Sequence, residues 1–302
     1  MEKLSAVYFK NVKRVLLHVI ELFIPSKVAK RNFGSWATFP KFKLKPDTTK
    51  YNKTINVAFC FNEGYIPFAL TAISSLLENS PGCKYDIYCV SDIAKTSQTK
   101  ILKYIYERYS NGKIIFLKPN KDYDHAHSGW WSKAIWWRCM LPKLLPDTVK
   151  RIIYADVDVL FVRDLREANE LKMGTNLLAG CFDSPTYVNS GFLVMNIAQM
   201  RRENKYSEMV SWAENNDSRF PDQDMLNNVC RGRIIPMSRK FNVIVAGGYS
   251  FLKTMTASQY RDLRYPVMLH YAEHIKPWDA KIKRFLTFDM YRKFHNAVKN
   301  NY

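Results

Sequence analysis

The order of apolar and polar positions along the chain predicts an α/β protein. Near-continuous apolar runs, which are typical of buried parallel strands, occur at 55–61, 85–90 and 114–117. Apolar residues at helical spacing fill 66–77, and a second helix is expected near 96–109. Strands that alternate with helices imply a mostly parallel central sheet flanked by helices, in which ligands bind at the carboxyl ends of the strands.

The rest of the chain continues the alternation. A helix over 133–145 is expected to lead into a buried strand at 151–155. Further strands are expected near 177–181, 188–197 and 266–270, and further helices through Trp212 and near 224–230. The loop after the first strand and the end of the strand at 151–155 should then share one cleft.

Two carboxylates stand where the strand at 151–155 ends. Residues two apart in extended backbone point to the same side, so Asp156 and Asp158 can converge on one point. Two like charges this close would repel, and one would take up a proton unless a cation joined them. A hard divalent ion, Mn²⁺ or Mg²⁺, is the natural partner and leaves room for substrate phosphates. The alternative is a solvated loop after a strand.

A histidine and a lysine near the other end of the chain extend this hypothesis. A metal held by two carboxylates favours a third protein ligand, and His270, which ends the strand at 266–270, can supply an imidazole. Lys276 offers a point charge for a phosphate. A structural histidine and a solvated surface lysine are the alternatives.

Further polar residues lie at the ends of predicted elements. Asn189 and Gly191 begin a strand, where glycine permits close approach of backbone to a ligand. Asp222 opens a helix and can serve as its cap. Asp183 follows a strand and is either an acceptor for a sugar hydroxyl or a loop carboxylate.

The charge of the chain favours anionic partners. Lys and Arg number 46 against 27 Asp and Glu, which gives +19. Residues 1–53 hold twelve of the former and three of the latter, hence +9, and the remaining residues carry +10. An amphipathic basic helix expected within 1–31 either lies on an anionic membrane surface or packs on the domain, and a basic linker follows it.

The cysteines and the apolar runs bear on location. None of the six cysteines forms a Cys-x-x-Cys pair, and several lie in apolar runs, which favours reduced, buried thiols in a cytoplasmic protein. No signal peptide is evident, and the apolar run at 15–25 is too short to span a bilayer. We expect a cytoplasmic protein that can dock peripherally on the inner face of the membrane.

Taken in order, these pieces resemble glycosyltransferase family 8, the retaining sugar-nucleotide transferases that include bacterial lipopolysaccharide galactosyl- and glucosyltransferases and glycogenin. The resemblance covers residues 55–278, and its motifs lie at 154–160, 189–192, 222–227 and 270–278. It implies a GT-A fold, in which a Rossmann-like nucleotide half joins an acceptor half. The chain then divides into a basic segment at 1–53, a GT-A domain at 54–278 and a basic tail at 279–302.

The resemblance also implies roles for single residues. Mn²⁺ or Mg²⁺ would be held against a UDP diphosphate by Asp156, Asp158 and His270. The UDP-sugar would be bound by Phe59, Cys60, Asn62, Tyr65, Arg138, Asp156, Val157, Asp158, Asn189 and Lys276, with Tyr65 stacked on uracil. The catalytic candidates beside the donor sugar are Gln223, Asp183 and Asp222.

Two departures from the family pattern stand out. Asn62 occupies a position that is often acidic in relatives, although an amide can still read uracil through its donor and its acceptor. Glu273 stands where relatives usually have glycine beside the diphosphate, and its carboxylate would repel phosphate.

The expected function is transfer of a hexose, glucose or galactose, from a UDP-sugar to a saccharide or lipid-linked saccharide acceptor, as in lipopolysaccharide or other surface polysaccharide synthesis. Retention could proceed through a covalent intermediate or by front-face attack, and the poor nucleophilicity of Gln223 favours front-face attack. One rival is a nucleotidyltransferase that uses the aspartate pair to activate a triphosphate. Another is a basic nucleic-acid-binding module, although no nucleic-acid partner is expected.

Overall fold

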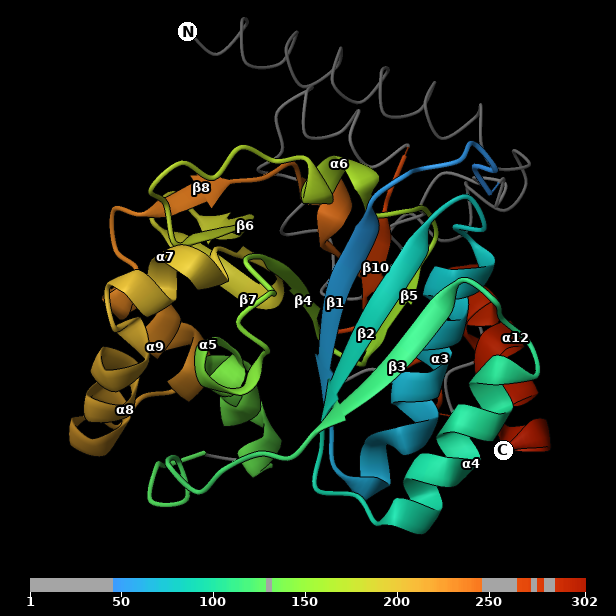
Figure 1. Ribbon diagram of the computed structural model, residues 1–302, viewed down its shortest axis with the longest axis horizontal. Helices are drawn as coiled ribbons and strands as arrows, with labels where there is room; N and C mark the ends of the chain where they lie inside the picture. Colours follow the sequence, from blue (N-terminus) through green and yellow to red (C-terminus); the bar gives the residue numbers. More distant parts are fainter. Residues whose placement is uncertain (1–45, 129–131, 246–264, 273–275, 280–285) are drawn as a thin grey trace, which may run out of the picture.

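The architecture comes from a computed structural model, which describes residues 46–128, 132–245, 265–272, 276–279 and 286–302 (Figure 1). The amphipathic segment expected within 1–31 and Glu273 lie outside these residues. A seven-stranded sheet has the strand order β3-β2-β1-β4-β7-β6-β8. A smaller sheet has the order β5-β10-β9.

Four parallel strands form the first half of the large sheet: β1 Thr54–Cys60, β2 Lys84–Val90, β3 Gly112–Leu117 and β4 Ile152–Ala155. The connections carry the short 3₁₀-helix η1 Glu63–Tyr65 and the helices α3 Ile66–Glu78 and α4 Lys95–Tyr106. Pro67 lies in the first turn of α3, where its missing N–H leaves no hydrogen bond unmade. The four strands, α3 and α4 agree with the apolar pattern of the sequence, whereas η1 lies where a loop was expected.

The second half of the sheet changes direction. β7 Tyr187–Met195 is antiparallel to β4 and to β6 Leu178–Ser184, whereas β8 Ile234–Pro236 is parallel to β6. Ser184 pairs with Tyr187, so only two residues join β6 to β7, and a loop this short permits only an antiparallel pair. The expected α/β class with a mostly parallel sheet is confirmed, with β7 as its antiparallel insertion.

Two expected helices are divided. The segment expected as one helix over 133–145 is the 3₁₀-helix η2 Lys133–Met140 followed by α5 Leu141–Leu144. Pro142 has no N–H to donate to the carbonyl of Arg138, so no α-helical ladder runs from η2 into α5. The helix expected through Trp212 is α7 Ile197–Arg202 and α8 Lys205–Asn215, separated at Asn204, whose φ of 49° is left-handed.

The small sheet joins three distant parts of the chain. β5 Val159–Phe161 is antiparallel to β10 Met268–His270, which is parallel to β9 Val243–Ile244. Only the strand near 266–270 was expected, and it begins two residues later than predicted. The other described helices are α6 Arg166–Asn169, α9 Pro221–Val229, the 3₁₀-helix η3 Arg239–Phe241 and α12 Leu286–Asn301.

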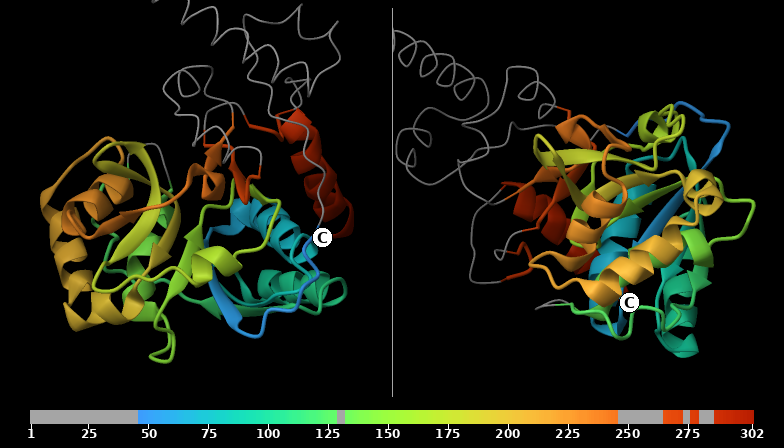
Figure 2. Two further views of the ribbon diagram at one scale, coloured as in Figure 1. Left: turned by 90° about the horizontal axis from the view of Figure 1, so that it is seen from above. Right: turned by 90° about the vertical axis from the view of Figure 1, so that its left-hand side faces the viewer.

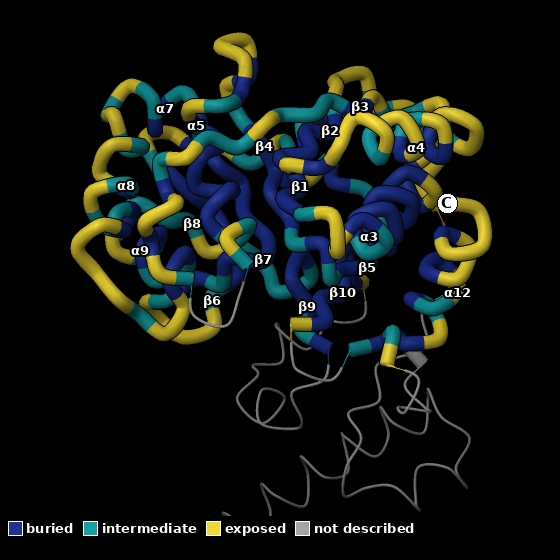
Figure 3. The backbone as a smooth tube through the Cα atoms, turned by 90° about the horizontal axis from the view of Figure 1, so that it is seen from below, coloured by how far each residue is buried: buried dark blue, intermediate teal, exposed yellow. Residues whose placement is uncertain are grey.

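Helices cover both faces of the large sheet, so its inner strands are buried on both sides, whereas the edge strands β3 and β8 are mostly half-buried (Figure 3). On β1, Val57 and Phe59 face a core under α3 and α4, whereas Ala58 and Cys60 face a core under η2, α5 and α7–α9. This double burial explains the near-continuous apolar run of β1.

The C-terminal helix α12 packs against α3 (Figure 2). Phe288 and Tyr291 of α12 join Tyr271 and the small sheet in a third apolar cluster. The expected division of the chain at residues 53 and 278 stays a prediction. Among the described helices, none combines the length and the apolar character that crossing a bilayer requires.

Candidate functional site

Two carboxylates and an imidazole converge at the carboxyl end of β4. The possible ligand atoms of Asp156, Asp158 and His270 all lie within 4.8 Å of one another. Nε2 of His270 is 3.2 Å from Oδ1 of Asp158 and 3.6 Å from Oδ2 of Asp156. Extended backbone was predicted through the pair, but a bend at Val157 and Asp158 brings the two carboxylates together instead.

The small sheet brings His270 to the aspartates, although 112 positions separate it from Asp158. His270 pairs with Val159, the first residue of β5, and the N–H of Tyr271 donates to the carbonyl of Asp158 at 2.9 Å. On the other side, the N–H of Asp156 donates to the carbonyl of Gly191 at 3.0 Å. Backbone pairing therefore fixes all three side chains at one point.

Lys276 lies against the same cluster. Its Nζ donates to Oδ2 of Asp158 at 2.8 Å and to the carbonyl of Tyr271 at 2.6 Å. Burial raises the pKa of the Asp158 carboxyl, but the opposite charges of His270 and Lys276 outweigh burial and hold this pKa well below its usual range. Burial lowers the pKa of His270, but the carboxylate of Asp158 outweighs it and raises this pKa.

This electrostatic balance fits a divalent cation. The cluster contains two hard carboxylates and one imidazole, a donor set that suits Mn²⁺ or Mg²⁺. The positive charge that the carboxylates require is supplied here by His270 and Lys276. A bound ion could supply the same charge.

A buried arginine holds the carboxylates from the other side. Arg138 forms ion pairs with Asp156, at 2.9 Å, and with Asp222, at 3.2 Å, and its Nη1 donates to the carbonyl and to Oγ of Ser190, both at 3.0 Å. Its guanidinium carbon lies 4.5 Å from the centroid of the Tyr154 ring. Burial and the charge of Asp156 raise the pKa of Asp222 more than Arg138 lowers it.

The expected catalytic residues lie around β7. Nδ2 of Asn189 donates to Oδ2 of Asp183 at 3.0 Å, and the N–H of Ser190 donates to Oε1 of Gln223 at 2.8 Å. Oγ of Ser190 donates to Asp222 at 3.3 Å. Asp183, Asp222 and Gln223 are therefore all tied to the two residues 189 and 190.

The expected uridine-binding residues lie at the end of β1, beside β4. Burial raises the pKa of the Cys60 thiol more than the nearby positive charge of Arg138 lowers it, so the thiol stays protonated. Nδ2 of Asn62 donates to Oγ of Ser132 at 3.2 Å, whereas Oδ1 has no hydrogen-bond partner among the described residues. Tyr65 is 45% exposed, which leaves its ring accessible.

Phe59 and Val157, expected among the donor-binding residues, are buried with their side chains in the apolar core. Only their backbone can contact a ligand.

Three residues of the site were not predicted from the sequence. The hydroxyl of Tyr154 donates to Oδ1 of Asp156 at 2.6 Å, Ser190 binds Arg138, and Oδ1 of Asn242 lies 2.8 Å from Nδ1 of His270. Ser190 lies in the motif at 189–192, in which only Asn189 and Gly191 were predicted to be functional. Asn242 lies between η3 and the two-residue strand β9, where the sequence carries no periodic signal.

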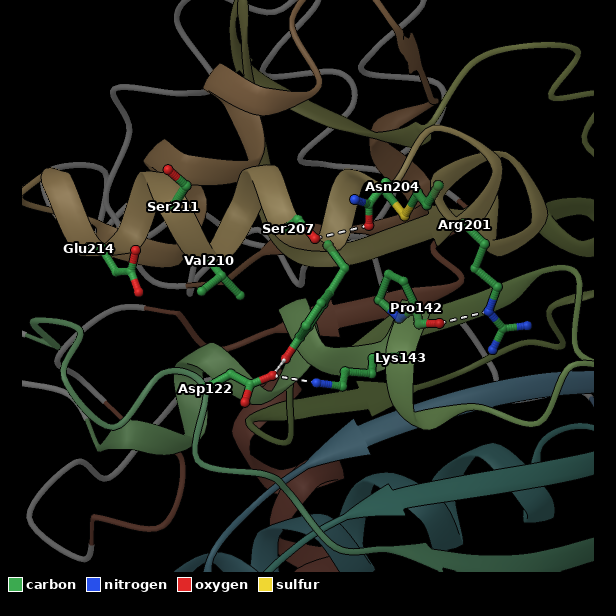
Figure 4. Close-up of a pocket in the computed structure, with 11 residues that line it drawn as sticks. Asp122, Pro142, Lys143, Arg201, Asn204, Ser207, Val210, Ser211 and Glu214 are labelled. Atoms are coloured by element: carbon green, nitrogen blue, oxygen red, sulfur yellow. Dashed lines mark hydrogen bonds and ion pairs between the residues drawn. The ribbon is translucent and has the colours of Figure 1, made fainter.

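A separate hollow of about 570 Å³ lies beside α7 and α8 (Figure 4). Asp122 at its edge accepts from Nζ of Lys143 at 2.8 Å and from the hydroxyl of Tyr206 at 2.5 Å. None of the residues expected in the functional site lines it. The hollow is therefore a separate feature from the carboxylate cluster.

Comparison with known proteins identifies the family. The model of glycosyl transferase family 8 matches residues 56–281, which is 226 of the 302 residues. This chain belongs to glycosyl transferase family 8. The resemblance drawn from the motifs is thereby confirmed.

Relatives and solved structures agree with this assignment. A lipopolysaccharide 1,2-glucosyltransferase of Escherichia coli K12 is 23% identical over 257 residues, which cover 75% of this chain and 73% of the relative. A predicted glycosyltransferase of Haemophilus influenzae is 25% identical over 213 residues, and the match spans only 64% of its length. The solved structure of the galactosyltransferase LgtC with donor and acceptor sugar analogs has a TM-score of 0.68 at 20% identity, covering 80% of this chain and 96% of LgtC, and it supports the GT-A fold.

Proposed function

We propose that this family 8 chain transfers a hexose, glucose or galactose, from a UDP-sugar to a saccharide acceptor in a metal-dependent reaction that retains configuration. The observation that carries the proposal is the convergence of Asp156, Asp158 and His270 with Lys276 at the carboxyl end of β4. Ligands of open α/β sheets bind at this edge. The lipopolysaccharide glucosyltransferase among the relatives and the galactosyltransferase LgtC support the choice of hexose.

In this proposal Asp156, Asp158 and His270 would hold Mn²⁺ or Mg²⁺. When bound, the ion acts as a Lewis acid and neutralises charge that grows on the leaving diphosphate. Lys276 adds a preorganised positive charge at the same place, because its ammonium already touches a metal-binding carboxylate.

The donor sugar lies against β7 in this proposal, where Asp183, Asp222 and Gln223 are tied to residues 189 and 190. Their oxygens can stabilise the cation-like anomeric carbon. Because the amide of Gln223 is a poor nucleophile, we favour front-face attack, in which the acceptor proton passes to the leaving phosphate. A sugar trapped covalently on Asp183 or Asp222 would contradict front-face attack.

The uracil is proposed to stack on the exposed ring of Tyr65 and to bond with the side-chain amide of Asn62, whose Oδ1 is buried without a partner among the described residues. The acceptor is proposed to be a saccharide or lipid-linked saccharide of lipopolysaccharide or another surface polysaccharide. The charge of +9 on residues 1–53 supports peripheral docking on the anionic inner face of the membrane.

The experiment is a screen of UDP-sugars with Mn²⁺, scored by release of UDP with and without an acceptor saccharide. Asp158→Asn and excess chelator should each abolish release, whereas Asp122→Asn, in the separate hollow of Figure 4, should leave it unchanged. Release of pyrophosphate from UTP and a sugar phosphate would favour the nucleotidyltransferase instead. Sugar transfer that survives the chelator would contradict the metal-dependent proposal.

A further inference from the structure

A chain of hydrogen bonds leads from a carboxylate to the far side of the His270 ring. Asp183 accepts from Nδ2 of Asn189 at 3.0 Å. Oδ1 of Asn189 accepts from Nδ2 of Asn242 at 2.7 Å, and Oδ1 of Asn242 lies 2.8 Å from Nδ1 of His270. These hydrogen bonds link residues from β6, β7, the residue just before β9, and β10.

Asp183, the first residue of this hydrogen-bond series, determines which way the donors and acceptors of the series point. A carboxylate is an acceptor, so the amide nitrogen of Asn189 must face Asp183. The amide oxygen of Asn189 then faces the other way, where it also accepts from the N–H of Gly191 at 2.9 Å. A backbone N–H can only donate, so two independent neighbours assign the same orientation to Asn189.

The orientation of Asn189 fixes the orientation of Asn242. Because Asn189 presents an oxygen, Asn242 must present its amide nitrogen to it, and this leaves the oxygen of Asn242 for His270. An oxygen acceptor requires that Nδ1 of His270 carry a proton. Nε2, on the opposite side of the ring, is the atom that faces Asp156 and Asp158.

We propose that Asn242 is a positioning residue for the divalent cation: by accepting from Nδ1 of His270, it directs the Nε2 lone pair at the site between Asp156 and Asp158. This inference rests on the proposed metal-dependent function. It does not depend on the charge of His270, because Nδ1 donates to Asn242 whether or not Nε2 carries a proton. A hydrogen bond of this kind fixes the tautomer and the ring orientation of a metal-binding histidine.

Asn242 is itself held in place. It is 5% exposed, its N–H donates to the carbonyl of Arg239 at 3.1 Å, and the next residue, Val243, pairs with Leu269. The backbone of Asn242 is thus tied to the strand that carries His270. Little freedom remains for the amide to leave the ring.

The test measures Mn²⁺ binding rather than turnover. Binding to the full chain in the presence of UDP is followed by the electron paramagnetic resonance signal of free Mn²⁺. Asn242→Leu, which cannot accept a hydrogen bond, should weaken binding about 10- to 100-fold. Asn242→Asp loses the donor to Oδ1 of Asn189 but keeps the acceptor for Nδ1 of His270, and it should bind at least tenfold more tightly than Asn242→Leu. Gln199→Leu is the matched control, because Gln199 is also buried and hydrogen bonded, to Glu203, but lies on α7 beside the separate hollow, and it should bind Mn²⁺ as the wild type does.

A second measurement reads the tautomer directly. With Mg²⁺ and UDP, the ¹⁵N chemical shifts of His270 should show a protonated Nδ1 and an unprotonated Nε2 in the wild type and in Asn242→Asp. The opposite tautomer, or wild-type Mn²⁺ affinity in Asn242→Leu, would overturn this inference alone. A wild-type protein that binds no Mn²⁺ would overturn the proposed metal dependence and this inference with it.

Discussion

The backbone at Gly191 lies directly against the ring of His270. A β-carbon built on Gly191 would stand 2.2 Å from Cε1 and 2.7 Å from Nδ1 of His270. Protein atoms do not approach this closely, so any side chain at position 191 must displace the imidazole. The glycine is therefore required by the packing of the proposed metal ligand and not by its own backbone conformation, because its φ is not positive.

Gly191→Ala should lower stability and metal affinity together. Forcing a methyl group into this contact should cost about 1–3 kcal/mol of unfolding free energy, and moving the imidazole should weaken Mn²⁺ binding about tenfold or more. Chemical denaturation and Mn²⁺ titration measure the two effects. Gly64→Ala is the control for stability, since the nearest atom to its added methyl would be 3.7 Å away. Unchanged Mn²⁺ affinity in Gly191→Ala would show that His270 is not a ligand.

Removal of the buried arginine should strongly destabilise the fold. Arg138→Met leaves Asp156 and Asp222 without their guanidinium partner, and breaking a buried pair in this way costs about 3–5 kcal/mol. Arg166→Met, which removes a more exposed pair with Asp164, should cost about 1 kcal/mol or less. Urea denaturation at neutral pH compares the two variants.

A second substitution should restore part of the stability that Arg138→Met loses. Asp222→Asn removes one of the carboxylates that Arg138→Met leaves unpaired, so the double variant should be about 1–2 kcal/mol more stable than Arg138→Met alone. Strictly additive losses would contradict the buried-charge explanation and point to lost packing on the Tyr154 ring instead.

Local spacing made part of this site predictable. Asp156 and Asp158 follow a buried strand, and two carboxylates two positions apart after a strand are enough to predict a cation site. β1 to β4 could also be predicted from their apolar runs, because strands buried on both faces have few polar positions. The direction of β7 was missed because the predicted strands left six residues between them, whereas the real hairpin loop has two.

The remainder depends on contacts that a local pattern does not contain. β5 and β9 have three and two residues, too few to show a period of two. The sequence therefore suggested His270 as a third ligand but gave no means of bringing it to the aspartates. Asn242 contacts His270, 28 positions away in the sequence, and Asn189, 53 positions away, and it lies in no recognisable motif.

Lys276 should affect metal and nucleotide in opposite directions. Its Nζ donates to Oδ2 of Asp158 at 2.8 Å, so the ammonium would compete with a metal cation for the same carboxylate. Lys276→Met should therefore bind Mn²⁺ alone at least as tightly as the wild type. Binding of UDP with Mn²⁺ should weaken about tenfold, because one charge-assisted contact to phosphate, about 1.4 kcal/mol, is lost.

Isothermal titration calorimetry separates the two affinities of Lys276→Met. Lys143→Met is the matched control, because Lys143 also pairs with a carboxylate but lies in the separate hollow of Figure 4, and both affinities should be those of the wild type. A parallel fall of both affinities in Lys276→Met would mean that the lysine only maintains the structure of the site.

His295 of α12 is buried against α3. It is 3% exposed, its Nδ1 lies 3.1 Å from the hydroxyl oxygen of Thr71, and its ring stacks on Phe68 with centroids 5.4 Å apart. The Thr71 hydroxyl donates to the carbonyl of Pro67 at 2.7 Å, so it accepts from Nδ1 of a neutral imidazole. Nε2 is buried with no hydrogen-bond partner among the described residues, and a proton there would be stranded.

Acidification should therefore loosen α12 from α3. Burial, with a smaller contribution from Lys299, lowers the pKa of His295 from 6.5 to about 4, so between these values the unfolded chain binds a proton that the folded chain does not. Stability should be fully present above about pH 6.5 and fall as pH drops toward 4, by at most about 3 kcal/mol from this group. His295→Phe, which keeps a ring on Phe68, should lose this component, so the difference in unfolding free energy between the two proteins should change across the window. Parallel pH profiles for wild type and His295→Phe would show that His295 stays accessible to protons in the folded state.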